Sequence, residues 1–555
     1  MRVLGIEGTA WCASAALYDA ETDSVLIESD PYEPDSGGIH PREAAEHMSE
    51  AIPAVVDAVL TAAESRYGPD AVDAVAFSRG PGLGPCLRTV GTAARALAGA
   101  LDVPLVGVNH MVAHLEIGRH RSGFDSPVCL NASGANAHLL GYHDGRYRVL
   151  GETMDAGVGN AIDKFTRHVG WSHPGGPKVE AAAAEYAAEH AAGDPGDLLD
   201  LPYVVKGMDF SFSGISSAAN DAYADGVPVG EICFSLQEHV FAMLTEVAER
   251  ALSLTGATEL VLGGGVAQND RLREMLSTMC VDRGADFHAP EPRFLRDNAG
   301  MIAVLGAKMA RAGDTVAIAD SAVDPNFRPD RVPVTWRDDG PVAVGEGVDA
   351  PETGRRGAEA VVDIEASDGD DRVIKRRVPK RYRHPDLDRS IRRDRTVAEA
   401  RLTSEARRAG VPTPLVYDID VPNATLTLQY VGDRDLAVAL NDGDAWVRAA
   451  GRHLATLHGA GIVHGDPTTR NVRIADEPRS APKAARTTLI DFGLGYHTGH
   501  VEDHAMDLHV FEGSVRATAT DPEALIEAFE TGYAAVGDRT VLDRLRDVEG
   551  RGRYR

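Results

Sequence analysis

The sequence predicts an α/β fold followed by a smaller α+β domain. Up to residue 328, short apolar segments such as VLGIEG (3–8), AVAFSRG (74–80) and LVLGGG (260–265) run into a glycine or polar turn and then a helix-like stretch. This alternation is typical of α/β proteins. Residues 337–353, RDDGPVAVGEGVDAPET, lack periodicity and predict a linker. We therefore expect one domain at 1–328, a linker at 329–353 and a second domain at 354–555.

Composition excludes several classes of protein. No run approaches the roughly 18 apolar residues of a membrane span, and MRVLGIEGTA begins as a strand rather than a signal peptide. The five cysteines are far apart without a CxxC pair, which indicates a reducing, cytoplasmic location. The net charge of −28 is spread along the chain and is typical of a strongly solvated acidic surface. Any nucleic-acid contact must therefore use local basic patches.

Three glycine-rich turns follow predicted strands in the first domain. They are Glu7–Thr9, Ser133–Asn136 and Gly263–Gly265. Glycine lets backbone amides approach a phosphate, and the helix that follows adds partial positive charge. One such turn also serves chain geometry alone, but three in one domain indicate a nucleotide held between two halves.

The segment NHMVAH (109–114) places His110 and His114 four residues apart. On a helix this spacing brings both imidazoles to one face, about 6 Å apart, where one metal ion can take both. The HExxH metalloprotease motif needs glutamate after its first histidine. Met111 stands there, so a protease of that class is disfavoured.

Ten motifs of the first domain resemble, in order, the universal tRNA threonylcarbamoyltransferase family in its archaeal and eukaryotic branch. They are GIHPREAAEH (38–47), SRGPGLGPCLRTVG (78–91), NHMVAH (109–114), SGAN (133–136), GETMDAGVGNAIDKFTR (151–167), HPGGPKVE (173–180), VKGMDFSFSG (205–214), FSLQE (234–238), GGVAQN (264–269) and RDNAGMIA (296–303). The resemblance implies an actin-like, Hsp70-like ATPase fold of two related halves. It also implies transfer of threonylcarbamoyl from threonylcarbamoyl-adenylate to N6 of the adenosine 3′ of the anticodon, in tRNAs reading ANN codons.

The same resemblance implies the roles of individual residues. His110, His114 and Asp297 would hold one divalent metal ion, expected to be iron. The metal would act as a Lewis acid while the amides of a glycine turn stabilise the developing oxyanion. The residues expected to contact the adenylate are Asn131, Ala132, Ser133, Gly134, Ala135, Asp163, Gly176, Glu180 and Asn269.

One position departs from the family's pattern. The archaeal branch usually has a tyrosine before the SG(A/G)N turn, as LYVSG, and uses its phenol as a metal ligand. This chain has Leu130-Asn131-Ala132-Ser133-Gly134 there. Asn131 offers a neutral amide oxygen or leaves the position to water or a ligand phosphate. We therefore expect a tolerance for divalent ions, with the fourth protein ligand left open.

The second domain carries the elements of a protein kinase. In HGDPTTRN (464–471), Asp466 and Asn471 have the Asp-x4-Asn spacing of a catalytic loop. There the aspartate accepts the hydroxyl proton and the asparagine ligates magnesium. Asp491 begins a DFG tripeptide, and Lys375 and Glu399 are placed for the lysine–glutamate ion pair of an ATP site. ATP and Mg²⁺ are the expected ligands.

The details predict an atypical kinase. GRRGAEA (354–360) replaces GxGxxG, no arginine precedes Asp466, and no APE follows DFG. The residues expected at the phosphates are Gly354, Gly357, Ala358, Glu359 and Ala360. These features resemble the small kinase/ATPase subunit of the KEOPS complex. The resemblance implies two further partners, a small dimerising subunit and a regulatory subunit.

Residues 372–395 hold eleven lysines and arginines against three acids. In so acidic a chain this segment is the expected docking site for tRNA phosphates. The alternative is that Lys375 faces ATP and several arginines pair with nearby acids. Arg551, Arg553 and Arg555 resemble a basic tail for tRNA.

Two other functions compete with tRNA modification. One is a regulatory protein kinase tethered to a chaperone-like ATPase, and the other is a nucleotide-binding scaffold with little catalysis. Neither needs the triad of His110, His114 and Asp297. The sequence leaves open whether the second domain phosphorylates proteins or only hydrolyses ATP.

Overall fold

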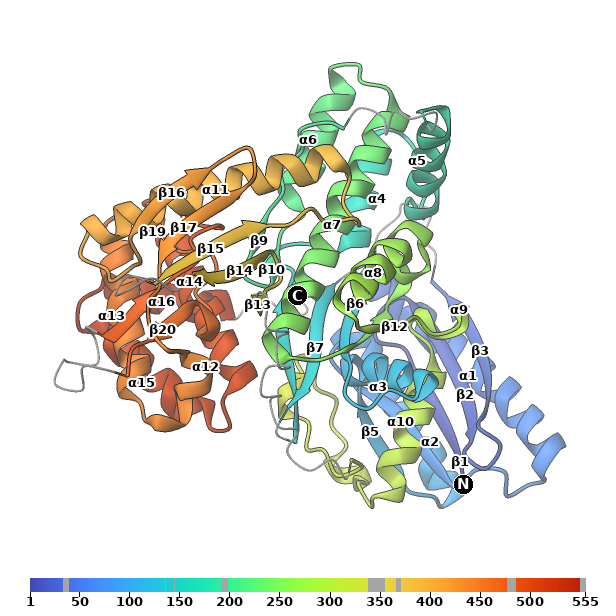
Figure 1. The fold of residues 1–555 in the computed structure, drawn as a ribbon. Helices are drawn as coiled ribbons and strands as arrows, with labels where there is room; N and C mark the ends of the chain where they lie inside the picture. Colours follow the sequence, from blue (N-terminus) through green and yellow to red (C-terminus); the bar gives the residue numbers. More distant parts are fainter. Residues whose placement is uncertain are drawn as a thin grey trace.

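The computed structural model describes residues 1–32, 39–134, 136–143, 145–190, 198–337, 355–365, 371–476 and 486–549. An N-terminal part, up to residue 337, packs side by side with a C-terminal part that begins at residue 355 (Figure 1). In these ranges no helix is both long and apolar enough to cross a membrane.

Two five-stranded sheets with the same strand succession organise the N-terminal part. In each, three antiparallel strands are followed by two strands parallel to the first, which gives the orders β3-β2-β1-β4-β5 and β12-β11-β6-β7-β8. The first sheet comprises β1 (Arg2–Glu7), β2 (Cys12–Asp19), β3 (Ser24–Pro31), β4 (Ala74–Gly80) and β5 (Leu105–Asn109). The second comprises β6 (Val128–Ala132), β7 (Ala137–His143), β8 (Arg146–Glu152), β11 (Glu259–Gly263) and β12 (Asp286–His288). The N-terminal part is therefore built from two halves of one topology.

Helix α3 (His110–Ser122) lies between the two sheets. Its residues from His110 to Gly118 are all buried, as is typical of a helix covered on every side. Close approach requires a small residue: a Cβ at Gly118 would stand 2.1 Å from Val261 Cγ1 on β11. Helix α10 (Ala299–Arg311) packs on the first sheet in the same way, with Gly306 against Ala76. Both helices are thus fixed tightly in place.

The remaining helices of the N-terminal part pack around the two sheets. In the first half these are α1 (Pro41–Tyr67) and α2 (Gly84–Leu101). In the second half they are α4 (Val158–His168), α5 (Gly176–His190), α6 (Ser213–Ala224), α7 (Val229–Thr255), α8 (Asp270–Arg283) and the short α9 (Pro292–Leu295), together with the hairpin of β9 (Val205–Lys206) and β10 (Asp209–Phe210). Helix α7 is buried through most of its 27 residues and stands at the boundary with the C-terminal part (Figure 1).

The C-terminal part has a sheet region and a helical region. An antiparallel sheet in the order β13-β14-β15-β17-β16 comprises β13 (Arg355–Arg356), β14 (Ala360–Glu365), β15 (Arg372–Arg377), β17 (Thr425–Gln429) and β16 (Val416–Asp420), and is crossed by α11 (Pro385–Arg408). The helical region comprises α12 (Leu436–Ala439), α13 (Ala445–Gly459), α14 (Val501–Thr518), α15 (Pro522–Ala534) and α16 (Arg539–Glu549). Short strands between them are β18 (Arg434–Asp435), β19 (Ile462–Val463), β20 (Val472–Ile474), β21 (Thr487–Leu489) and β22 (Tyr496–His497).

Residues at the start of the expected linker pack on the N-terminal part. Val332 is buried in its core, and the guanidinium of Arg337 lies 3.7 Å from the centroid of the Tyr142 ring. Residues 338–353 of the expected linker, and also Ala135, Gly354 and the arginines of the tail, lie outside the described residues.

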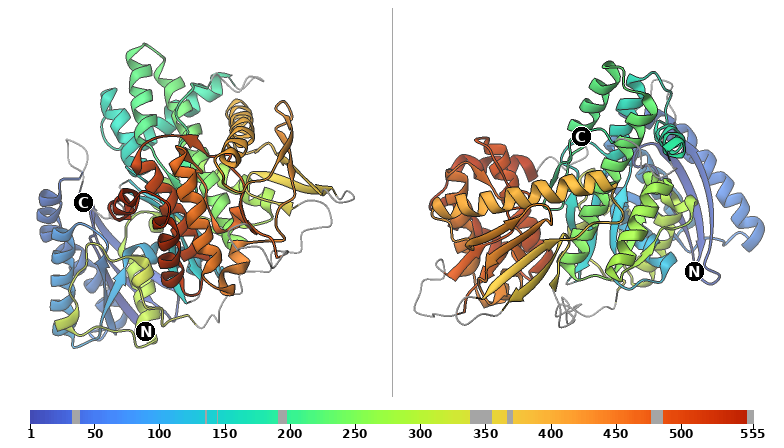
Figure 2. Two further views of the ribbon diagram at one scale, coloured as in Figure 1. Left: turned by 90° about the vertical axis from the view of Figure 1, so that its left-hand side faces the viewer. Right: turned by 45° about the horizontal axis from the view of Figure 1, so that its top comes forward.

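Buried ion pairs join the two parts. The carboxylate of Glu246, on α7, accepts from Arg383 at 2.6 Å and from Arg395 at 2.9 Å, and it pairs with Arg250 at 3.0 Å. One turn along α7, Glu249 pairs with Lys380 at 2.6 Å. The N-terminal end of α11 meets the helices of the N-terminal part (Figure 2), where its apolar residues pack against α7.

The expected tRNA-docking role of residues 372–395 is wrong for five of its eleven cations and stays a prediction for the others. Five of the eleven are buried, namely Lys375, Arg377, Lys380, Arg383 and Arg395, and all five pair with carboxylates. On the surface, Arg381 pairs with Asp282 of α8, and Arg389, Arg392 and Arg393 pair with acids of α11. Among the buried cations, Lys380, Arg383 and Arg395 pair with acids of the N-terminal part, whereas the other two pair within the C-terminal part. Both sets agree with the alternative that arginines of this segment pair with nearby acids.

Replacing Glu246 by glutamine tests how strongly this boundary depends on charge. Breaking a buried ion pair leaves unpaired charge and costs about 3–5 kcal/mol, so we expect Glu246→Gln to lower the free energy of unfolding by that amount in a urea titration at fixed salt. Glu274→Gln is the control, because the exposed Glu274–Arg271 pair is expected to contribute less than about 1 kcal/mol. Equal losses in both variants would contradict the prediction.

Candidate functional site

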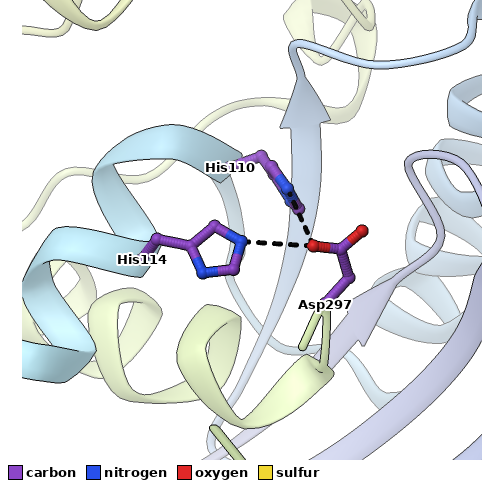
Figure 3. Close-up of side chains that lie close together, drawn as sticks. All are labelled: His110, His114 and Asp297. Atoms are coloured by element: carbon purple, nitrogen blue, oxygen red, sulfur yellow. Dashed lines mark hydrogen bonds and ion pairs between the residues drawn. The ribbon is translucent and has the colours of Figure 1, made fainter. Parts of the chain in front are cut away.

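Two histidines and an aspartate meet where α3 and α10 begin. The Asn109 side chain at the end of β5 accepts from the amide of Val112 and starts α3, so His110 and His114 stand one turn apart. Asp297 precedes the residue that caps α10. Its Oδ1 lies 3.4 Å from Nε2 of His110 and 3.2 Å from Nε2 of His114 (Figure 3). The ligand atoms of the three residues lie within 4.8 Å of one another.

Glu7, at the end of β1, completes this group from behind. Its Oε2 lies 3.2 Å from Nδ1 of His110, and its other oxygen accepts from the amide of Thr9. The glutamate is fully buried. A carboxylate on Nδ1 fixes the imidazole so that Nε2 faces the centre of the triad. The sequence singled out Glu7 only as part of a glycine-rich turn.

The carboxylates at the triad favour a positive charge beside them. Burial opposes charging of His110, but the carboxylates of Glu7 and Asp297 outweigh it and raise the pKa of His110 to about 10. Burial would raise the pKa of Asp297, but the neighbouring His110 holds that pKa far below its usual range. Burial lowers the pKa of His114. A divalent metal ion suits this site, because two imidazole nitrogens and a carboxylate surround a point that favours a cation.

A cavity of about 290 Å³ adjoins the triad between the two halves. The residues of the expected adenylate site that line it are Asn131, Ser133, Gly134, Asp163, Gly176, Glu180 and Asn269. Ala132 is buried in β6 and does not line it. Asp163 accepts from the amide of Gly175 at 2.8 Å, and Glu180 accepts from the amide of Asp270 at 2.9 Å. Helix α5 begins at Gly176, so its positive end faces this cavity.

A second group of expected site residues meets in the C-terminal part. Lys375 on β15 donates to Glu399 of α11 at 2.8 Å and pairs with Asp491 at 2.7 Å. Asn471 donates to Oδ2 of Asp466 at 3.1 Å. In the turn between β13 and β14, the amide of Gly357 donates to the carbonyl of Ala360 at 2.9 Å. Beside Lys375, Arg377 also pairs with Glu399 at 2.6 Å, a contact that the sequence did not predict.

An arginine of the N-terminal part reaches into this second group. Arg250, on α7, donates to Oδ2 of Asp466 at 2.8 Å and also pairs with Glu359. Burial raises the pKa of Asp466 to about 7, against the opposing effect of Arg250. Burial also opposes ionisation of Asp491, but Lys375 holds its pKa at about 2. One aspartate is thus firmly ionised, while the other titrates near neutrality.

Comparison with known proteins assigns the chain to a family. The family model described as tRNA N6-adenosine threonylcarbamoyltransferase matches residues 22–304. The chain belongs to this family. The resemblance predicted from the sequence motifs is therefore confirmed, and the chain takes part in tRNA threonylcarbamoyladenosine biosynthesis.

Members of this family with both parts are similar along the whole chain. A protein of Halobacterium salinarum is 69% identical over 557 residues, which cover 100% of this chain and 99% of the relative. One of Methanospirillum hungatei is 49% identical over 555 residues, with 100% and 99% covered. Both are named "Probable bifunctional tRNA threonylcarbamoyladenosine biosynthesis protein". Among solved structures, HypF of T. kodakarensis aligns with 55% of this chain and 47% of its own at 14% identity and a TM-score of 0.36, too low to support an argument.

Glu7 should control metal affinity without touching the ion. Partners that orient a ligating histidine typically contribute about 10- to 100-fold in affinity, so we expect Glu7→Ala to weaken Co²⁺ binding by that factor. Glu7→Gln should lose less, because its amide oxygen can still accept from Nδ1 of His110. Titration against a chelator measures both, with the exposed Glu28→Ala as control. Identical affinities in all three variants would show that Glu7 does not orient the ligand.

Proposed function

We propose that this chain transfers threonylcarbamoyl from threonylcarbamoyl-adenylate to N6 of the adenosine 3′ of the anticodon, in tRNAs reading ANN codons. The observation that carries the proposal is that the triad and seven expected adenylate residues surround one cavity. The repeated sheet topology supports an actin-like, Hsp70-like ATPase fold for residues 1–328. Residues 354–555 would then form the kinase-like domain, joined by 329–353.

In this reaction the bond from the carbamoyl carbon to the phosphate oxygen breaks, AMP leaves with the electron pair of that bond, and a bond to N6 of adenosine forms as N6 loses one proton. His110, His114 and Asp297 would hold the metal ion, for which iron is the expected choice, and a bound divalent ion would supply Lewis-acid polarisation. Glu7 orients His110, and the N-terminal end of α5 offers partial positive charge to a phosphate. Asp163 and Glu180 line the cavity and would accept from ribose hydroxyls.

The kinase-like domain, we propose, supports the transferase as an ATPase. Lys375, Glu399, Asn471 and Asp491 have the contacts of an ATP and Mg²⁺ site. Asp466 would accept the proton of a substrate hydroxyl, but Arg250 occupies the space against its carboxylate. That contact favours ATP hydrolysis over phosphorylation of a protein. The other KEOPS subunits, one dimerising and one regulatory, complete the proposed assembly in the cytoplasm.

Nucleoside mass analysis tests the transferase directly. After incubation with threonylcarbamoyl-adenylate and unmodified tRNA, the intact chain should yield the modified nucleoside. His114→Ala and Asp297→Ala should give none above the enzyme-free blank, because each removes a metal ligand. His143→Ala is the control and should retain activity, because His143 stands at the C-terminal end of β7 and does not line the cavity. Full modification by either triad variant would remove the metal from the mechanism.

The pH dependence of ATP hydrolysis tests the second site. Because the acid form of Asp466 cannot accept a proton, the rate should fall on the acid side with a midpoint near pH 7. Arg250 lowers this pKa, so Arg250→Met should move the acid limb to higher pH. Arg293→Met, at an exposed position, is the control for loss of an arginine. Asp491→Asn should stop ATP hydrolysis, which shows that the measured hydrolysis takes place at this site. An unchanged limb in Arg250→Met would contradict the assignment.

A further inference from the structure

The metal centre has three protein donors on α3 and before α10, and the second sheet faces it from the other side of the cavity. Asn131, on β6 of that sheet, stands where the archaeal branch usually has a ligating tyrosine. We propose that His138, on the neighbouring strand β7, is a further protein ligand of this metal and takes the role of that tyrosine. The inference rests on the proposed metal site and concerns a residue that neither the motifs nor the comparisons assign.

The register of the sheet places His138 beside Asn131. The two residues are direct partners in the antiparallel pairing of β6 and β7. Direct cross-strand partners project from the same face of a sheet, with Cβ atoms about 4.5–5.5 Å apart. Both line the cavity, as do His110, His114 and Asp297. A ring on β7 therefore enters the cavity next to the position from which a tyrosine on β6 would reach the metal.

His138 has no other evident purpose. Its side chain is 1% exposed, and within the described part of the chain neither ring nitrogen has a hydrogen-bond partner. Oδ1 of Asn131, in a residue 3% exposed, is also without a partner there. Buried polar side-chain atoms are nearly always paired, and leaving one unpaired costs about 1–3 kcal/mol. Two adjacent orphaned groups that line one cavity point to a ligand that satisfies them.

The chemistry of His138 suits a metal ligand. Burial, reinforced by the nearby His114 and His110, lowers the pKa of its imidazole to about 3, so the ring is neutral and a nitrogen lone pair is available. The donor set would then be three imidazole nitrogens and one carboxylate, with a net charge of −1. Such a set favours divalent ions in tetrahedral geometry, whereas a tyrosinate would favour ferric iron. His138 is not part of the group whose ligand atoms lie within 4.8 Å of one another, so the proposed coordination requires its ring to turn toward the ion.

The test uses Co²⁺ and Cu²⁺ as probes on the full chain. In His138→Phe, which keeps the ring volume, we expect the Kd for Co²⁺ to rise at least about 10-fold and the intensity of its visible d–d bands to change. Electron paramagnetic resonance of the Cu²⁺ form should show one fewer coupled nitrogen. His138→Gln, a smaller polar replacement, should give the same loss of a nitrogen. His143→Phe, on the same strand but outside the cavity, should change neither signal.

A double substitution makes the test sharper. With Asn131→Tyr, a phenolate can occupy the fourth position, so adding His138→Phe should then have little effect on the Kd. If His138→Phe and His138→Gln leave the Kd, bands and nitrogen count unchanged, His138 is not a ligand, even if binding of an adenylate analogue weakens. His110→Ala separates the two claims. If it also leaves metal binding unchanged, the proposed metal site itself is wrong.

Discussion

The packing of the two parts against each other depends on the ion pairs of one buried carboxylate, that of Glu246. Three guanidiniums surround it, two from the C-terminal part and Arg250 from its own helix. None of these charges could be buried alone, so the parts must meet where the opposite charges face each other. The same cluster aims Arg250 at Asp466. The charges at the boundary therefore also reach the second site, through the contacts of Arg250 with Asp466 and Glu359.

Helix α7 also connects the two sites physically. Leu236, Gln237 and Phe241 line the cavity beside the triad, and Arg250 contacts Asp466 in the second group of site residues. Arg250 follows Gln237 by thirteen positions, which corresponds to about 20 Å of helix. Since most of the helix is buried, its two ends cannot shift independently without disturbing both cores. The same need to balance buried charge governs the triad, where Glu7 and Asp297 enclose His110.

Much of both sites could be predicted because the decisive spacings are local. His110 and His114 are one helical turn apart, and Asp466 and Asn471 lie in one loop. Contacts between distant segments could not be predicted, as Arg250 and Glu7 show. The burial of cations in the basic segment could not be predicted for the same reason, because their partners Glu246 and Glu249 precede it by more than a hundred residues. His138 left a usable signal: residues 131 and 138 are placed symmetrically about the SGAN turn, as expected for partners in a hairpin.

Coincident unfolding of the two parts is the most direct measure of whether they form one body. Trp336 packs on the N-terminal part, and Trp446 is buried in the C-terminal part. Two variants, each keeping one of these tryptophans with the others replaced by phenylalanine, would be unfolded in urea at fixed salt and followed by fluorescence. If the buried charges on α7 unite the parts, both tryptophans report the same midpoint. Loss of the Trp446 signal at a clearly lower urea concentration than that of Trp336 would show that the parts unfold independently and would contradict this account.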